Sequence, residues 1–248
     1  MPELTAVPSA PPSVHRVLVV GGGAPAVRLL ELARCSTPRN ASFELVTINA
    51  ASAEVGGPEL LLQADPQAPI PAVRAVLRAL HETKPDALVV GYPDDARGRS
   101  AFTDVVERAT AAAPVDVIVC IDRHDRPWRR VLVPYLHDVL DSRALGLARR
   151  IARTGDADVT VLHVVEPLSG DEVDEQLRAA VGRCALKVVT ADDPIAAAAA
   201  EARLGYDLIV LGASERRTRG RYFTMRQQRL LLATDATLVI VHPGRQAG

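Results

Sequence analysis

Four apolar segments in the first half of the chain return, in the same order, in the second half. The offset is about 115 residues for the first pair and drifts to about 121 for the later ones. The pairs are HRVLVV at 15–20 with RRVLVP at 129–134, FELVTIN at 43–49 with VTVLHVV at 159–165, KPDALVVG at 84–91 with GYDLIVLG at 205–212, and APVDVIVCI at 113–121 with DATLVIVHP at 235–243. An ordered repeat of this length predicts two copies of one structural unit.

Each copy alternates short β-branched runs with helical stretches. In the second copy, apolar residues recur on one helical face from Ala144 to Ile151, and Asp192 or Asp193 can cap a later helix whose first turn holds Pro194. Apolar strands that alternate with helices predict a parallel sheet covered on both faces, and right-handed crossovers favour a doubly wound topology. We therefore expect an α/β fold of two tandem doubly wound parallel sandwiches, with five strands in each.

The repeat also suggests the boundaries of these units. The first unit is expected over 15–124 and the second over 128–248, joined at DRHDRPW (122–128), where Trp128 is expected to anchor one copy to the other. Residues 1–14 are rich in proline and read as a disordered tail. Between 50 and 70 turn residues dominate, so the third strand of the first copy is expected to be weak or missing.

The last strand of each copy, VDVIVC at 115–120 and TLVIVH at 237–242, is strongly apolar. An unpaired edge of such a strand invites pairing with another strand. We expect the two copies to pair through these strands about a pseudo-twofold axis, as an internal dimer. Whether two whole chains associate further, as a homodimer, stays open.

Composition argues against several classes of protein and of site. The chain has 248 residues, is 48% hydrophobic and carries a net charge of −1, so nothing global indicates nucleic-acid binding. Three scattered cysteines without a C-x-x-C pair indicate free buried thiols in a reduced compartment, and no zinc or other metal site. The start lacks the features of a signal peptide, and no apolar run approaches the roughly 18 residues of a membrane span. A cytoplasmic location is expected.

A basic segment, GASERRTRGRYFTMRQQRLL at 212–231, directly follows the apolar run DLIVL. Its six arginines against the single Glu215 give a local charge of +5. Such a segment can attract phosphates or an acidic partner. Three interpretations stay open: an altered anion site, a basic surface for a protein or membrane partner, and a solvated loop.

The loops after the first and fourth strands of each copy are the expected ligand positions, because open parallel sheets bind ligands beyond the carboxyl ends of their strands. In the first copy this loop begins with Gly21, Gly22 and Gly23, and GGGAPA satisfies the G-x-G-x-x-A dinucleotide pattern. That pattern requires an acid at the end of the second strand, where this chain has Asn49. A tight strand–helix turn explains the glycines equally well.

The second copy resembles a universal stress protein domain over 129–243, and the first copy resembles it more faintly over 15–121. The residues that carry this resemblance are RVLVP, SRALGLARRIARTGDADVTVLHVVEP, DLIVLGAS and RLLLATDATLVIVHP. It implies the five-stranded, Rossmann-like and UspA-like sandwich and pairing through the last strand. For members that bind ATP it implies an aspartate just after the first strand, which recognises adenine. It also implies G-x-x-G, nine residues and then G-[ST] around the phosphates after the fourth strand.

This chain departs from the ATP pattern at both places. Leu136 stands about where the aspartate should be, with Asp138 two residues further on. Gly212 is present, but Glu215 replaces the second glycine, and Met225–Arg226 lie near the expected Gly-Ser pair. A carboxylate close to a triphosphate is repelled, and the loss of glycine removes the backbone that forms a nest of N–H donors. An ordinary ATP site is therefore not expected.

The first copy departs in a similar way, because Asp94 takes the second glycine's place after Gly91. Arginines can replace a lost nest with bidentate contacts to an anion. The candidate ligand-binding residues are therefore Pro134, Tyr135, Gly212, Ala213, Ser214, Arg216, Arg217 and Gly220 in the second copy, and Gly21, Gly22 and Gly23 in the first.

No catalytic residue is assigned, because G-x-x-x-x-G-K-[ST], G-x-S-x-G and H-E-x-x-H are all absent from the sequence. His137 and Asp138 are adjacent at the right edge of the sheet but lack a nucleophile. His163 lies within an apolar strand and is expected in the core, whereas His242 closes the last strand and is expected to be exposed at an edge.

Two functions follow, neither of them enzymatic. The first is a tandem universal-stress-type protein that senses or binds a small anionic ligand, such as ATP or another nucleotide, in a degenerate site. The alternative is a regulatory or interaction module that binds no ligand and acts on a protein partner, since similar double domains occur as soluble tails of cation or amino-acid transporters. An adenylate-transferring enzyme, a third reading, lacks a phosphate motif.

Overall fold

The strands and helices of the first repeat appear in the order that the sequence predicts. A computed structural model describes residues 14–21, 26–36, 42–49, 69–92, 107–108, 110–135, 141–165, 167, 175–213 and 225–244. The first-half elements are β1 (Val14–Gly21), α1 (Ala26–Ser36), β2 (Ser42–Asn49), α2 (Pro69–Thr83), β3 (Ala87–Gly91) and β4 (Asp116–Ile121). The third strand expected between 50 and 70 falls outside the described residues, apart from the start of α2.

The second half contains five strands, as expected. Its elements are β5 (Arg130–Tyr135), α4 (Asp141–Gly155), β6 (Asp158–Val165), α5 (Glu175–Val181), β7 (Ala185–Thr190), α6 (Pro194–Ala202), β8 (Leu208–Gly212), α7 (Met225–Ala233) and β9 (Thr237–His242). Pro194 opens α6, and the Asp193 carboxylate caps it by accepting the N–H groups of Ile195 and Ala196, both at 3.0 Å. The cap is therefore Asp193, one of the two predicted alternatives.

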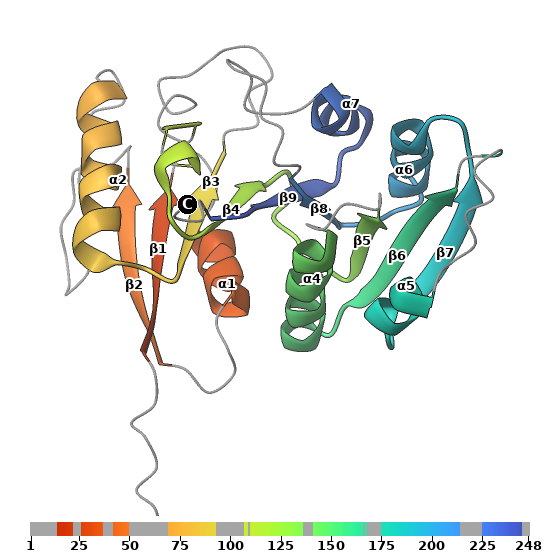
Figure 1. The fold of residues 1–248 in the computed structure, drawn as a ribbon, viewed down its shortest axis with the longest axis horizontal. Coiled ribbons are helices and arrows are strands. Elements are labelled where there is room, and N and C mark those ends of the chain that lie inside the picture. Colours follow the sequence, from red (N-terminus) through yellow and green to blue (C-terminus); the bar gives the residue numbers. More distant parts are fainter. Residues whose placement is uncertain are drawn as a thin grey trace, which may run out of the picture.

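The described strands form one nine-stranded sheet in the order β2-β1-β3-β4-β9-β8-β5-β6-β7 (Figure 1). Within each half all neighbours are parallel, and the two halves meet where β4 pairs with β9 in antiparallel fashion, with Val119 opposite Ile240. The predicted pairing through the last strands is confirmed. It follows that the two units share a single continuous sheet.

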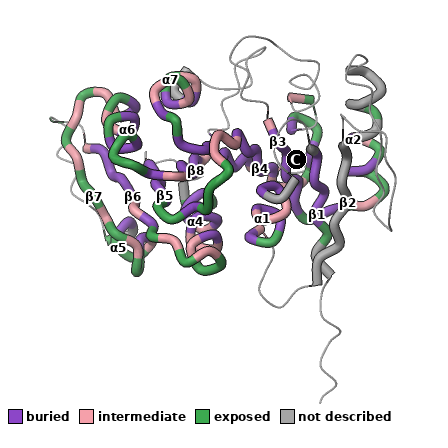
Figure 2. Tube along the Cα trace, turned by 180° about the vertical axis from the view of Figure 1, so that it is seen from behind, coloured by how far each residue is buried: buried purple, intermediate pink, exposed green. Residues whose placement is uncertain are grey.

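Helices cover both faces of this sheet. On one face α1 and α4 lie side by side near the middle, and a single hydrophobic core runs beneath them through both halves (Figure 1). On the other face α2 covers a core in the first half, and α6 and α7 cover a separate core in the second. The strands in the middle of the sheet are buried, as Figure 2 shows, because successive side chains enter opposite cores.

The contact between α1 and α4 joins the halves on the shared face. The Arg150 guanidinium donates from Nε to the carbonyl oxygen of Cys35 at 2.6 Å. Trp128 is 3% exposed, and the Arg28 guanidinium lies 5.1 Å from the centre of its ring. The expectation that Trp128 anchors one copy to the other is consistent with this packing.

The expectation that His242 is exposed is wrong. His242 is 3% exposed, because β9 lies inside the sheet, between β4 and β8, with Val117 opposite His242. Past this strand the backbone runs so close to the first half that a Cβ on Gly244 would lie 2.6 Å from the carbonyl oxygen of Pro114. The N–H of Gly244 donates to Asp116 Oδ1 at 3.0 Å. This close approach explains why glycine is needed there.

Candidate functional site

The order of the strands defines where each half can bind a ligand. In the second half the chain runs from β5 through β6 to β7 on one side, and then crosses back to place β8 on the other side of β5. Such a reversal opens a crevice at the carboxyl ends of the two strands that flank it. In the second half these ends are Tyr135 and Gly212, and in the first half they are Gly21 and Gly91.

Tyr135 is the last residue of β5 and so lies at the carboxyl end of that strand. It is half-buried at the end of β5, where its ring makes an edge-on contact with His163, with ring centroids 6.4 Å apart and an interplanar angle of 64°. His163 is fully buried in β6, as the sequence indicated. Pro134, the preceding residue, is buried within β5 opposite Leu162. The Tyr135 side chain therefore packs against the hydrophobic core and remains partly exposed.

The loop after β8 starts differently from a phosphate-binding nest. The N–H of Ala213 donates to the carbonyl oxygen of Val241 at 2.9 Å, and Ala213 is 1% exposed. The equivalent residue in the first half, Tyr92, likewise donates its N–H to Cys120 at 2.7 Å. Because this amide extends the sheet, it is not available to a ligand. Of the predicted backbone donors after Gly212, the first is therefore used in the fold.

Other predicted site residues fall outside the described part of the chain. These are Gly22, Gly23, Ser214, Arg216, Arg217 and Gly220, together with Leu136, His137, Asp138, Asp94 and Glu215. Gly21 is described as the last residue of β1, with Asn49 of β2 opposite it.

The last part of the arginine-rich segment, from Met225 on, is helical. Helix α7 begins at Met225, and its residues Gln227 and Leu230 are buried. Arg229 Nη2 lies 2.6 Å from Asp193 Oδ2, so this arginine ties α7 to the cap of α6. The backbone N–H of Ala196 and then Arg229 lower the pKa of Asp193. At least one of the six arginines therefore serves the fold.

Sequence reasoning missed Arg123, which fixes α7 from the linker. Its guanidinium donates to the carbonyl oxygens of Leu231, at 2.8 Å, and Thr234, at the carboxyl-terminal end of α7. A cation is favourable at that end of a helix. Nothing local marks this residue, because its partners lie more than 100 residues away in sequence. The same linker residue donates its N–H to the Thr237 hydroxyl at 3.2 Å.

The described residues include no group of three or more His, Cys, Asp or Glu that could hold a metal ion. All three cysteines are free, and burial raises the pKa of the Cys35 and Cys120 thiols, which makes them poor nucleophiles. Among the described helices none is both long enough and apolar enough to cross a lipid bilayer.

Comparison with known proteins adds one structural finding. No sequence-family model matches the chain, and neither does any curated protein sequence. A universal stress protein from Archaeoglobus fulgidus DSM 4304 has a similar structure, with a TM-score of 0.57 at 15% identity, over 94% of this chain and 97% of that chain. A protein of unknown function from Pseudomonas aeruginosa PAO1 matches with a TM-score of 0.59 at 14% identity, over 93% of each chain.

These matches span both halves of the chain. The chain therefore has the fold of a universal stress protein, with two copies of the α/β unit in one polypeptide.

Proposed function

We propose that this chain is a tandem member of the universal stress protein family that binds a small phosphate-bearing ligand, with a nucleotide as the foremost candidate. The ligand would lie at the carboxyl ends of β5 and β8. The observation that supports this most directly is the switch in strand order between β5 and β8, two parallel neighbours that end at Tyr135 and at Gly212, the residue that leads into the arginine-rich segment. The three free cysteines suit a cytoplasmic location.

Each part of a nucleotide has a candidate contact. The half-buried Tyr135 ring offers a flat surface for a base. Arg216 and Arg217 follow Gly212 closely in sequence and can give the phosphates bidentate, charge-assisted hydrogen bonds. Ser214 and Gly220 supply a hydroxyl and a backbone free to approach the ligand. We propose binding without catalysis, because the sequence carries no phosphoryl-transfer motif.

One observation favours a second function, that of an interaction module without a ligand. The N–H of Ala213 is committed to Val241, and Glu215 stands where ATP-binding relatives have glycine. Both features weaken a phosphate nest. In that case the basic segment would contact an acidic surface of a protein partner, such as a transporter or a regulator.

A ligand-binding experiment separates these functions. The purified full-length protein is denatured and the supernatant is examined for released nucleotide. Melting curves are then recorded with ATP, ADP, a cyclic dinucleotide and inorganic phosphate. A ligand at a hundred times its dissociation constant should stabilise the fold by about 2.7 kcal/mol. Curves that stay unchanged with every ligand, and no released nucleotide, would favour the interaction module.

Matched arginine variants test the site itself. Arg216→Ala with Arg217→Ala should remove most of the stabilisation by ATP. Arg178→Ala with Arg183→Ala removes the same charge from exposed positions in and after α5 and should leave it intact. An equal loss in both double variants would mean that only overall charge matters.

A further inference from the structure

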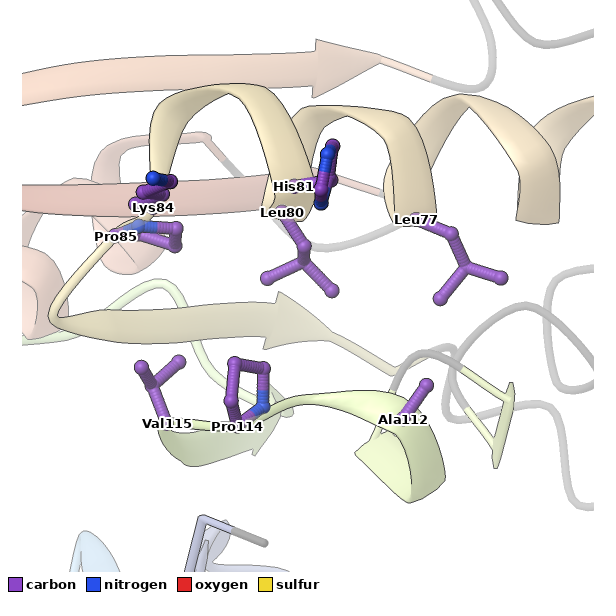
Figure 3. A pocket seen from close by; sticks show the side chains of 8 residues that line it. All are labelled: Leu77, Leu80, His81, Lys84, Pro85, Ala112, Pro114 and Val115. Carbon is purple, nitrogen blue, oxygen red and sulfur yellow. The ribbon is translucent and has the colours of Figure 1, made fainter. Parts of the chain in front are cut away.

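A cavity of about 410 Å³ lies between the carboxyl-terminal end of α2 and the residues that precede β4 (Figure 3). In Figure 3, Leu77 and Leu80 point from α2 toward Pro114 and Val115. The cavity lies at the amino-terminal ends of β3 and β4, and is thus distinct from the site proposed above, which uses carboxyl ends. Its volume falls in the range of small-molecule sites.

The internal repeat shows what occupies the same place in the second half. Lys84 and Gly205 each lie three residues before the next strand, β3 and β8 respectively, and both have a positive φ, 45° and 89°. The sheet register agrees, because Ala87 pairs with Asp116 as Leu208 pairs with Thr237. With this offset of 121, the cavity residues Leu80, His81, Pro85 and Val115 correspond to Glu201, Ala202, Tyr206 and Ala236, which are all buried.

In the second half an aromatic ring lies among these buried residues. Tyr206 is 6% exposed, and its hydroxyl donates to Glu201 Oε1 at 3.1 Å. The Arg130 guanidinium lies 4.7 Å from the centre of the ring. In the first half Pro85 stands at this position and has no such ring. A neighbouring hydrogen bond is the same in both halves: Arg16 donates to the Thr83 carbonyl oxygen, and Arg130 donates to the Leu204 carbonyl oxygen.

A second difference leaves the first-half cavity open. In the second half Arg203 Nε donates to the carbonyl oxygen of Ala233 at 3.1 Å, which links the ends of α6 and α7. The corresponding residues in the first half are Glu82 and Ala112. A carboxylate cannot donate a hydrogen bond to a carbonyl oxygen, so this link has no counterpart there.

We propose that this cavity binds a small aromatic acid. The ring would lie between the leucines of α2 and Pro114, near Pro85, the residue whose counterpart in the second half is Tyr206. The anionic group would lie toward Lys84 and His81, which line the cavity and can both donate hydrogen bonds to it. Apolar walls with one cationic end fit a flat ring that carries a single negative charge.

The test uses the full-length protein and 4-fluorobenzoate, observed by fluorine NMR. The expected result is saturable broadening of the ligand signal with a dissociation constant on the order of 1 mM, as suits so small a ligand. The neutral 4-fluorobenzyl alcohol should bind at least about tenfold more weakly, because it lacks the charge-assisted hydrogen bonds. The competitor cyclohexanecarboxylate keeps the charge but has a thicker, non-aromatic ring, and it should also bind more weakly. No saturable broadening, or equal binding of the neutral or the non-aromatic compound, would overturn the proposal.

Two variants that copy the second half identify the place. Lys84→Gly removes the ammonium group but suits the positive φ, so the affinity should fall about tenfold without a lower melting temperature. Glu82→Arg supplies the donor that closes the second half and should abolish binding. Unchanged binding in both variants would refute this location. Arg216→Ala with Arg217→Ala should leave 4-fluorobenzoate binding unchanged, which separates this proposal from the nucleotide site.

Discussion

The carboxylate of Asp207 fixes the start of β5 to the start of β8, and its removal tests how strongly the repeat depends on this link. Its Oδ2 accepts the backbone N–H groups of Arg129, at 2.9 Å, and Arg130, at 3.0 Å. Its Oδ1 also lies 3.2 Å from Arg126 Nε, but the Arg126 side chain is 58% exposed, so that ion pair contributes little. The two backbone hydrogen bonds therefore dominate.

The expected magnitude follows from these two bonds. A hydrogen bond to a charged group contributes about 1.5–3 kcal/mol. Because Arg129 and Arg130 are exposed, water can satisfy their N–H groups in the variant, and the lower end of the range applies. Asp207→Ala should thus cost about 3 kcal/mol of unfolding free energy, which lowers the melting temperature by about 6–12 °C in a chain of this size.

The assay is urea unfolding followed by the fluorescence of Trp128, the single tryptophan, which is buried. Asp207→Asn is the matched control, because its amide oxygen can still accept both N–H groups, and it should cost about 1 kcal/mol. Asp86→Ala, at the equivalent place in the first half, should also destabilise, since Asp86 Oδ2 accepts the N–H of Arg16 at 2.9 Å. A loss of less than about 1 kcal/mol of unfolding free energy for Asp207→Ala would refute this reasoning.

Three further predictions concern the core, the thiols and acid stability. Ile240→Lys places a charge at a position that is 0% exposed beside β4, so it should give aggregated or dissociated halves. The control Leu232→Lys, at a position that is 76% exposed, should change the unfolding free energy by less than about 0.5 kcal/mol. An unchanged melting point for Ile240→Lys would contradict the pairing of β4 with β9. A thiol reagent should modify Cys184 first in the folded protein, because burial raises the pKa of the other two thiols, and rapid reaction of all three would argue against this. The pKa of Asp193 is lowered in the folded state, so its carboxylate stabilises the fold at pH values above its unfolded-state pKa of about 4. This contribution is lost as the pH falls through the folded-state pKa. Asp193→Asn should therefore make the unfolding free energy depend less steeply on pH on the acid side.

Part of the candidate site could be predicted from the sequence, and part of it depends on tertiary contacts. Its position at the ends of β5 and β8 could be inferred from sequence, because alternating strands and helices restrict the topology to few choices. That Ala213 donates its N–H to Val241 could not be inferred, since the pairing depends on how far β8 and β9 extend together. The ring of Tyr135 against His163 likewise depends on the register of β5 and β6.

By itself, the sequence determined the features that depend on local pattern. The ordered repeat predicted two like units, and the apolar runs predicted their strands. Pro194, with Asp192 or Asp193 as a cap, predicted the start of α6, because caps and periodicity act over a few residues. The apolar last strands also predicted that the halves pair there, as β4 and β9 do. Only the tertiary structure decided how the residues around this junction pack. The burial of His242, the core shared under α1 and α4, and the cavity beside α2 all come from contacts between distant segments. Such contacts depend on side-chain volume and packing in three dimensions, which a local pattern does not encode.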